Sequence, residues 1–184
     1  MMRIITGKSR GVRLDTLEGL STRPTAEKVK EAIFSTLQFE IEGRRVLDLF
    51  AGSGQMSLEA LSRGAKSATL VDSSKEAAEI IRKNAIRTKL FPDVKVMVSD
   101  YKTAIMKLKN TEKFDLIFCD APYAAKLTAD AIERVLRADL LSDFAVIVTE
   151  SDEEEPYDFK GLNIRKHSKY GKTYITIYEK ADIQ

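Results

Sequence analysis

Short runs of apolar residues alternate along the chain with segments in which apolar residues recur at helical spacing. The apolar runs have the length of strands, are mostly continuous, and are rich in β-branched or aromatic residues, as expected of strands that are covered on both faces. The candidate strands are residues 45–50, 68–72, 94–98, 114–119 and 144–149. Because these strands alternate with helices, the pattern predicts an α/β fold built on a parallel sheet.

The segments between the candidate strands carry signals for the starts and ends of helices. The expected helices cover residues 25–37, 54–64, 73–85, 101–109 and 127–136. Thr25 is expected to cap the first of them, and Ser73-Ser74-Lys75-Glu76 fits a capping box. Gly64 stands where a glycine commonly ends a helix.

Both ends of the chain depart from this alternation. Residues 1–14 are basic and punctuated by glycine, which predicts a hairpin. Near the other end, residues 162–167 and 173–179 look like strands joined by a tight turn. Apolar and polar residues alternate in the second of these segments, and this is typical of an antiparallel, half-buried strand.

Length and charge fit a single domain with a local basic arm. The chain has 184 residues, so we expect one domain with an arm over residues 1–24 and an α/β core over residues 25–184. Thirty Lys and Arg residues against 28 Asp and Glu residues give a net charge of only +2. Residues 1–14, however, hold four basic residues and no acidic one. Such a stretch can bind nucleic acid even when the whole chain is near neutral.

The residue inventory excludes several classes of protein. A single cysteine, Cys119, cannot form an internal disulfide or a cysteine-based zinc cluster. A single histidine, His167, argues against a histidine-rich metal site or a Ser-His-Asp triad. The chain shows no signal peptide and no apolar run of membrane-spanning length. We therefore expect a cytoplasmic protein with no bound metal.

The first candidate for binding chemistry is a glycine loop. The strand over 45–50 runs into Ala51-Gly52-Ser53-Gly54, and a helix follows. Glycines in such a loop let the backbone approach a ligand, and the start of a helix offers free N–H groups. The dinucleotide-binding pattern is incomplete because Ser57 stands in place of its third glycine. The residues alone leave open a ligand loop or a tight turn.

Four successive candidate strands each carry an acidic residue: inside the first, at the end of the second, shortly after the third and directly after the fourth. These acidic residues are Asp48, Asp72, Asp100 and Asp120. In a doubly wound sheet these carboxylates would line the crevice at the carboxyl ends of the strands, where such folds bind ligands. A cofactor that carries positive charge and a ribose suits them better than a pyrophosphate. Solvated turn residues are the alternative interpretation.

The fourth loop, Cys119-Asp120-Ala121-Pro122-Tyr123, can hold a flat base. Asp120 would accept a hydrogen bond from an exocyclic amine, the carbonyl of Ala121 could accept a second, and Tyr123 would stack on the ring. Two acceptors favour pyramidalisation of that amine, whose lone pair is otherwise delocalised. The alternative is that Pro122 ends a strand and Tyr123 packs against the sheet edge.

These motifs carry a family resemblance. Asp48-x-Phe50-x-Gly52-x-Gly54 resembles the cofactor loop of class I S-adenosylmethionine methyltransferases. Residues 120–123 resemble the Asp/Asn-Pro-Pro-aromatic motif of the branch that methylates amines. Arg3-Ile4-Ile5, Arg10-Gly11, Arg23-Pro24-Thr25 and the stretch from Leu47 to Ala65 resemble the bacterial 16S ribosomal RNA guanine-N2 methyltransferases of the RsmD family. The similarity spans essentially the whole chain.

The resemblance implies a Rossmann-like class I methyltransferase fold, with a seven-stranded, mostly parallel sheet whose last strand is antiparallel. It implies S-adenosylmethionine as the methyl donor. The acceptor would be the exocyclic N2 amine of a guanine in 16S rRNA, within the small ribosomal subunit or its assembly intermediate. We expect a monomer that binds no membrane.

The resemblance also assigns roles to residues. The implied cofactor-binding residues are Asp48, Phe50, Ala51, Gly52, Gly54, Asp72, Ser73, Asp100 and Tyr101. Among these, Asp48 would lie near the amino-acid part, Asp72 at the ribose and Asp100 at the adenine. The implied catalytic residues, which would hold the guanine, are Asp120, Pro122 and Tyr123. The expected RNA contacts are Arg3, Lys8, Arg10, Arg13, Arg23 and Lys28.

One departure and three alternatives accompany this interpretation. Ala121 replaces the first proline of the fourth-loop motif, but its backbone carbonyl is retained, so we expect activity with a less rigid loop. A DNA adenine-N6 methyltransferase shares the motif, although 184 residues leave no room for a large target-recognition domain. A non-catalytic module that binds the cofactor and rRNA is the second alternative. A nicotinamide oxidoreductase is the third, weakened by Ser57.

Overall fold

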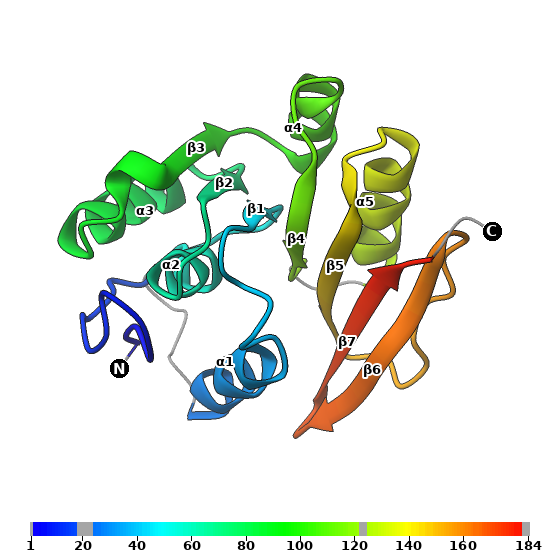
Figure 1. The fold of residues 1–184 in the computed structure, drawn as a ribbon, viewed down its shortest axis with the longest axis horizontal. Helices are drawn as coiled ribbons and strands as arrows, with labels where there is room; N and C mark the ends of the chain where they lie inside the picture. The colour runs from blue at the N-terminus through cyan, green and yellow to red at the C-terminus, as the bar shows by residue number, and fades with distance from the viewer. Residues whose placement is uncertain (1, 18–23, 122–124, 182–184) are drawn as a thin grey trace.

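The computed structural model describes residues 2–17, 24–121 and 125–181, and a twisted sheet crosses these residues (Figure 1). Its strand order is β3-β2-β1-β4-β5-β7-β6. The strands are β1 (Arg45–Asp48), β2 (Ser67–Asp72), β3 (Val94–Val98), β4 (Phe114–Cys119), β5 (Leu141–Ser151), β6 (Leu162–Tyr170) and β7 (Thr173–Lys180). The first five run parallel, whereas β7 is antiparallel to both β5 and β6. This confirms the predicted seven-stranded, mostly parallel sheet with an antiparallel last strand.

Helices cover both faces of the sheet. They are α1 (Pro24–Thr36), α2 (Gln55–Ser62), α3 (Lys75–Arg87), α4 (Tyr101–Leu108) and α5 (Ala125–Arg137), with a short 3-10 helix η1 (Phe91–Asp93) before β3. Buried residues of α1, α2 and α3 form one hydrophobic cluster with one face of the sheet. Residues of α4 and α5 form a second cluster with the other face. The alternating pattern therefore folds into three layers.

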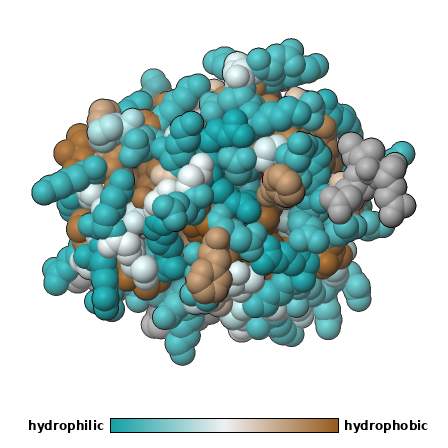
Figure 2. All heavy atoms as spheres, in the orientation of Figure 1, coloured by the Kyte–Doolittle hydropathy of each residue, from teal (hydrophilic) through white to brown (hydrophobic). Residues whose placement is uncertain are grey.

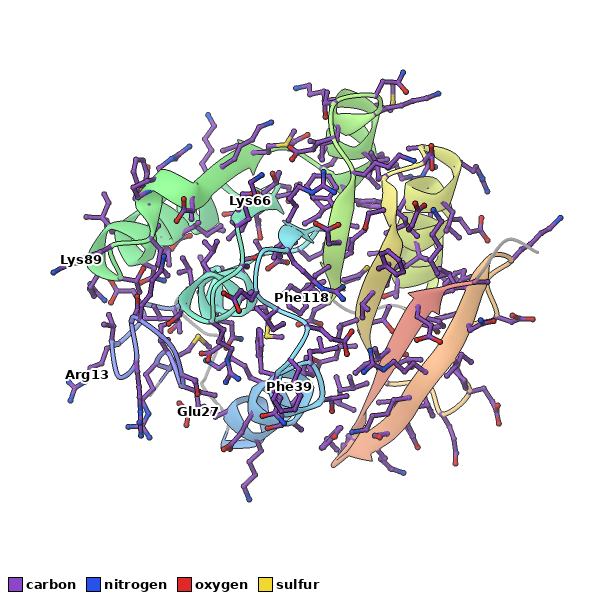
Figure 3. The ribbon with its side chains drawn as sticks, in the orientation of Figure 1. Arg13, Glu27, Phe39, Lys66, Lys89 and Phe118 are labelled. Atoms are coloured by element: carbon purple, nitrogen blue, oxygen red, sulfur yellow. The ribbon has the colours of Figure 1, made fainter. Side chains whose placement is uncertain are left out.

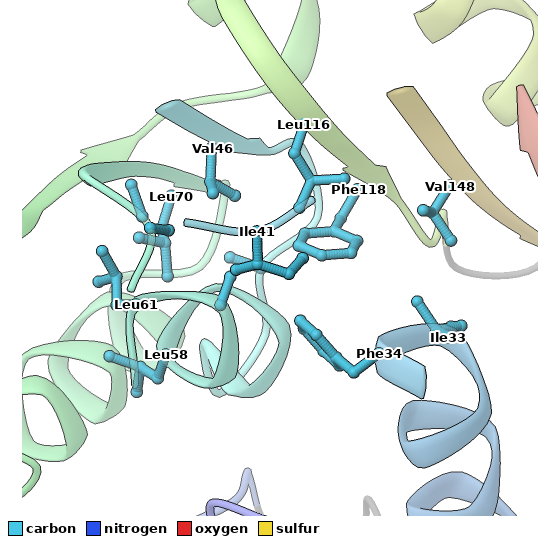
Figure 4. Packing of buried hydrophobic residues seen from close by; sticks show 14 of the residues in the cluster. Ile33, Phe34, Ile41, Val46, Leu58, Leu61, Leu70, Leu116, Phe118 and Val148 are labelled. Carbon is cyan, nitrogen blue, oxygen red and sulfur yellow. The ribbon is translucent and has the colours of Figure 1, made fainter. Parts of the chain in front are cut away.

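The side chains of the first cluster fill the space between α1, α2 and the middle of the sheet (Figure 4). Phe34 of α1 packs against Phe118 of β4 with ring centroids 5.9 Å apart. Ile33 of the same helix points toward Val148 of β5 in Figure 4. The even-numbered residues of β4 and β5 thus face α1, namely Leu116, Phe118, Val146 and Val148. By this alternation, the next even residues, Asp120 and Glu150, belong to the same face of the sheet.

Some predicted boundaries and caps were wrong. Ser74, not Ser73, caps α3, because its side chain accepts a hydrogen bond from the Ala77 N–H. Helix α1 already begins at Pro24, so Thr25 lies within its first turn and is not its cap. Proline is favoured at the start of a helix because the N–H it lacks has no helical partner there. Gly64 does follow the end of α2 with a left-handed φ of 103°.

The predicted N-terminal hairpin is present within residues 2–14. Arg3 and Arg13 form an antiparallel bridge, the Ile4 N–H donates to the Val12 carbonyl, and the Leu14 N–H donates to the Met2 carbonyl. Met2, Ile4 and Leu14 are buried in the first cluster. The hairpin is therefore part of the packed structure, and it lies beside α2 and α3 (Figure 1).

A buried ion pair fixes the hairpin to the helices. Glu59 of α2 accepts hydrogen bonds from the backbone N–H groups of Ile5 (2.7 Å) and Thr6 (3.0 Å). Lys30 of α1 lies with its Nζ 3.7 Å from Glu59 and donates to the Arg3 carbonyl at 2.7 Å. Burial lowers the pKa of Lys30, and the nearby Glu59 carboxylate opposes that shift. The polar groups are thus largely satisfied inside the protein, as buried charge requires.

The outer surface seen in Figure 2 is mostly hydrophilic, with scattered hydrophobic side chains. Within the described residues, no helix has both the length and the apolar character needed to cross a membrane. The division into an arm and a single core remains a prediction from the sequence.

Candidate functional site

The glycine loop between β1 and α2 adopts a conformation that favours glycine. Gly52 has φ 56° and Gly54 has φ 79°, both in the left-handed region that is costly for other residues. A Cβ on Gly54 would lie 3.0 Å from the Leu70 side chain, whereas a Cβ on Gly52 would meet no atom within 4 Å. A side chain at Gly54 would therefore crowd Leu70, whereas Gly52 faces open space into which a ligand can enter.

Asp72 ties this loop to the next strand end. One carboxylate oxygen accepts the Gly52 N–H at 2.9 Å and the other accepts the Ser74 N–H at 2.9 Å. The carboxylate is partly exposed and keeps further lone pairs for a ligand hydroxyl. Ser73 is exposed beside it, while Ala51 is buried and donates its N–H to the Val71 carbonyl. The predicted ribose-binding position is thus adjacent to the glycine loop.

Asp48 is buried in the floor beneath the loop. It accepts a hydrogen bond from the Ser57 hydroxyl at 3.0 Å. Burial raises the pKa of Asp48 to about 7, and the negative charges of Asp120 and Asp72 act in the same direction. Ser57, which breaks the dinucleotide pattern, is fully buried and supplies the partner that this carboxyl needs.

Two predicted cofactor residues, Phe50 and Tyr101, form an aromatic pair. Their ring centroids lie 5.3 Å apart. The Tyr101 hydroxyl donates to Asp130 at 2.6 Å, and burial together with this bond raises the pKa of Tyr101 to about 12. The hydroxyl is therefore engaged by α5, and the Tyr101 ring is buried in the second cluster, so the partly exposed Phe50 ring is the member of the pair that a ligand can reach.

Asp100 has a structural role in addition to its predicted one. Its carboxylate accepts the Thr103 N–H at 3.0 Å and the Thr103 hydroxyl at 2.7 Å, so it caps α4. These hydrogen bonds lower the pKa of Asp100. The side chain is exposed, and its adenine-binding role remains a prediction.

The fourth loop is described only in part. Pro122 and Tyr123 lie outside the described residues, as does Arg23 among the expected RNA contacts. Asp120 directly follows β4 and is exposed, and desolvation by the surrounding protein raises its pKa. Cys119 is buried, as predicted, and burial raises the pKa of its thiol far above the ordinary value.

Sequence reasoning missed Glu150. It is the last residue but one of β5 and follows Thr149, which is in register with Cys119, so Glu150 stands beside Asp120, which directly follows β4. Burial raises the pKa of Glu150 to about 7, with a further contribution from the charge of Asp120. The sequence did contain a signal for Glu150. It directly follows the apolar run 144–149, just as Asp120 directly follows the apolar run 114–119.

The predicted RNA contacts gather around the hairpin. Arg3, Arg10, Arg13 and Lys28 are exposed, and Lys8 forms a 3.8 Å ion pair with Asp93. Figure 3 shows the Arg13 side chain extending outward from the hairpin. These residues thus lie outside the core, on one part of the surface. Their role as RNA contacts stays a prediction.

Comparison with known proteins identifies the family. The model of the family described as Conserved hypothetical protein 95 matches residues 2–179. The chain belongs to this family, which includes RsmD. It is 33% identical over 156 residues to "Ribosomal RNA small subunit methyltransferase D" of Haemophilus influenzae, covering 84% of this chain and 81% of that protein.

Two other relatives extend over almost the full length. The Bacillus subtilis protein YlbH is 35% identical over 182 residues, which cover 97% of this chain and 99% of YlbH. The solved structure of Escherichia coli yhhF superposes with a TM-score of 0.88 at 30% identity and covers 97% of each chain. The predicted family, the methyltransferase fold and S-adenosylmethionine as cofactor are confirmed by these matches.

Proposed function

We propose that this protein methylates the exocyclic N2 amine of a guanine in 16S rRNA, with S-adenosylmethionine as the methyl donor. Membership of the RsmD family supports the coarser statement that it is an S-adenosylmethionine-dependent rRNA methyltransferase. The observation that supports the finer proposal is the position of Asp120, which directly follows β4, the strand paired with β1, so its carboxylate lies at the same sheet edge as the glycine loop and Asp48.

The described residues fit this cofactor. Open space at Gly52 admits a ligand close to the backbone, Asp72 offers acceptors for ribose hydroxyls, and the partly exposed Phe50 ring, packed on Tyr101, offers an apolar surface for a base. The bound cofactor supplies a methyl group on a positively charged sulfonium, and the nearby carboxylate of Asp48 suits positive charge. The protein contributes placement, which can supply roughly 7–11 kcal/mol when reacting groups are well oriented.

Asp120 would hold the acceptor amine. Its carboxylate can accept an N–H of the guanine amine, and the carbonyl of Ala121 can accept the other. No strong base is required, since the amine can release its proton after attack. His167 is consistent with this, because its two ring nitrogens hydrogen-bond to the Thr176 hydroxyl of β7 and to the Glu154 carbonyl in the segment before β6.

The decisive experiment is methyl transfer from labelled S-adenosylmethionine to small ribosomal subunits that lack this modification. Mass spectrometry of the nucleosides should identify N2-methylguanosine at one site. N6-methyladenosine would contradict the proposal and favour the adenine-N6 alternative. Cofactor binding without label in any nucleoside would favour the non-catalytic module.

Substitution of Asp120 tests its role separately. Asp120→Ala should abolish methyl transfer and leave the Kd for S-adenosylmethionine nearly unchanged, because the proposed partner of Asp120 is the base. Asp143→Ala is the matched control, since Asp143 is 89% exposed and lies at the start of β5, away from the glycine loop. Turnover of the Asp120 variant close to that of the control would remove Asp120 from the mechanism.

A further inference from the structure

A groove of about 250 Å³ separates the hairpin from α1. It is lined by residues 3–5, Arg10 and Gly11 on the hairpin and by Glu27 and Glu31 on α1. The volume is far above the roughly 30 Å³ of one water molecule and approaches the lower end, about 300 Å³, of small-molecule sites. A ligand about as large as one nucleotide is of the right size.

The two walls of the groove carry opposite charges that do not neutralise each other. Arg3 and Arg10 lie on the hairpin wall, and Glu27 and Glu31 lie on the helix wall. Among the ion pairs of the described residues, none joins either arginine to either glutamate. Gly11 has φ 83°, and a Cβ there would meet no atom within 4 Å, so the hairpin wall is open at this point. The groove therefore suits a ligand with an anionic end and a hydrogen-bond-donating end.

Glu27 requires such a donor. Its Oε1 atom is buried and has no hydrogen-bond partner among the described residues. A buried acceptor that lacks a partner is costly, and native proteins rarely retain one without a reason. Figure 3 shows Glu27 on the side of α1 that faces the hairpin.

The hairpin that forms one wall of the groove also contacts the cofactor loop. Met2, the residue before Arg3, has its sulfur 3.4 Å from the Ser53 hydroxyl of the glycine loop. Lys30, one turn along α1 from Glu27, bonds the Arg3 carbonyl and so holds the two walls together. An rRNA strand bound at the cofactor loop can therefore also reach the hairpin.

We propose that the groove between the hairpin and α1 is a nucleotide subsite, in which Arg3 and Arg10 hold a phosphate and Glu27 accepts an N–H of the base. This inference rests on the proposed function, because the nucleotide belongs to the rRNA strand beside the methylated guanine. Arginine binds phosphate oxygens through charge-assisted and often bidentate hydrogen bonds. Bases of single-stranded RNA are commonly recognised through their polar edges, and guanine offers two adjacent N–H groups to a carboxylate.

The test is a titration of the full chain, in which binding is monitored through the backbone amide NMR signals. The probes are guanosine 5′-monophosphate, inorganic phosphate and a single-stranded RNA hexamer. Guanosine 5′-monophosphate should shift the signals of Ile5 and Gly11. Glu27→Ala should weaken its binding about tenfold while leaving phosphate binding unchanged, and Arg10→Ala should weaken both. Lys107→Ala, an exposed change on α4, is the control and should alter neither.

The outcomes separate this inference from the proposed function. Shifts at Ile5 and Gly11 that persist in Asp120→Ala place the nucleotide in the groove and not in the acceptor pocket. A hexamer that displaces the mononucleotide and binds at least tenfold more tightly identifies an RNA strand as the ligand. The inference is wrong if Glu27→Ala, with unchanged thermal stability, binds the mononucleotide like the wild type. It is also wrong if the hexamer does not displace the mononucleotide, since the groove would then be a site for free nucleotides.

Discussion

At the scale of single residues, the hydrogen bond from the Ser57 hydroxyl to the Asp48 carboxyl stabilises the buried side of this site. Asp48 is 3% exposed, and only a hydrogen-bonding neighbour makes such burial tolerable. A third glycine at position 57 would leave that carboxyl without its side-chain partner. The departure from the dinucleotide pattern is therefore a feature of this pocket, and it favours a ligand other than a dinucleotide.

Gly52 gives a prediction at the scale of one residue. Gly52→Ala should weaken binding of S-adenosylmethionine more than tenfold, because the new methyl group would enter the open space before the loop. Gly43→Ala is the matched control, since Gly43 also has a left-handed φ, 75°, with no atom near its Cβ position. Both variants should lose about 1–2 kcal/mol of stability from backbone strain. Isothermal titration calorimetry that gave both variants the same Kd would show that the cofactor does not approach Gly52.

At the scale of elements, the hairpin and the glycine loop are joined through α3. Asn84 is fully buried, and its amide nitrogen donates to the Ser53 carbonyl of the glycine loop and to the Asp15 carbonyl after the hairpin, each at 3.0 Å. Its oxygen accepts the Asp15 N–H at 2.8 Å. The segment expected to contact RNA is thus fixed to the segment expected to contact the cofactor.

Gly7 tests how the hairpin is attached. A Cβ on Gly7 would lie 1.8 Å from the Ser62 carbonyl oxygen, so Gly7→Ala must push the hairpin away from α2. Gly161→Ala is the control, because Gly161 has a similar φ, 93°, and no atom within 4 Å of its Cβ position. Urea unfolding should show an additional loss of about 1–3 kcal/mol in the Gly7 variant, as overpacking causes. Equal free energies of unfolding would mean that the hairpin is not held against α2.

The basic side chains on the hairpin give a second prediction at this scale. Changing Arg10 and Arg13 together to alanine should weaken RNA binding and reduce the slope of log K against log salt by about 0.7 for each lost phosphate contact. Lys107→Ala, on α4, should leave the slope unchanged. Filter binding across a salt series measures this directly. An unchanged slope in the double variant would show that these arginines contact no phosphate of the bound RNA.

The sequence was sufficient to predict the helices and strands but not the contacts between residues that lie far apart in the chain. Continuous apolar runs predicted the strands because burial on both faces leaves a strong local signal. The Lys30–Glu59 pair and the Asn84 contacts left no such signal, because their residues lie 29 or more positions apart. Glu150 was missed for a related reason, since only the register of β5 with β4 brings it beside Asp120.

At the scale of the whole molecule, acids at one sheet edge make stability depend on pH. The folded protein raises the pKa of Asp48 and of Glu150 to about 7, from ordinary values of 3.8 and 4.5. Between about pH 4.5 and 7 the folded state therefore holds protons that the unfolded state has released. Unfolding then releases protons, so the free energy of unfolding decreases as pH rises through this window.

We therefore expect a lower Tm at pH 8 than at pH 5.5 when thermal unfolding is followed by circular dichroism. Asp48→Asn combined with Glu150→Gln should flatten this dependence, because neither replacement ionises. Asp143→Asn, at an exposed position remote from the glycine loop, should keep the wild-type dependence. If the double variant retained the full decrease in Tm, the carboxyls at the carboxyl ends of β1 and β5 would not be its cause. A flattened profile would show that these acids are held at a cost in stability, and a cationic cofactor that favours their ionised forms would offset that cost.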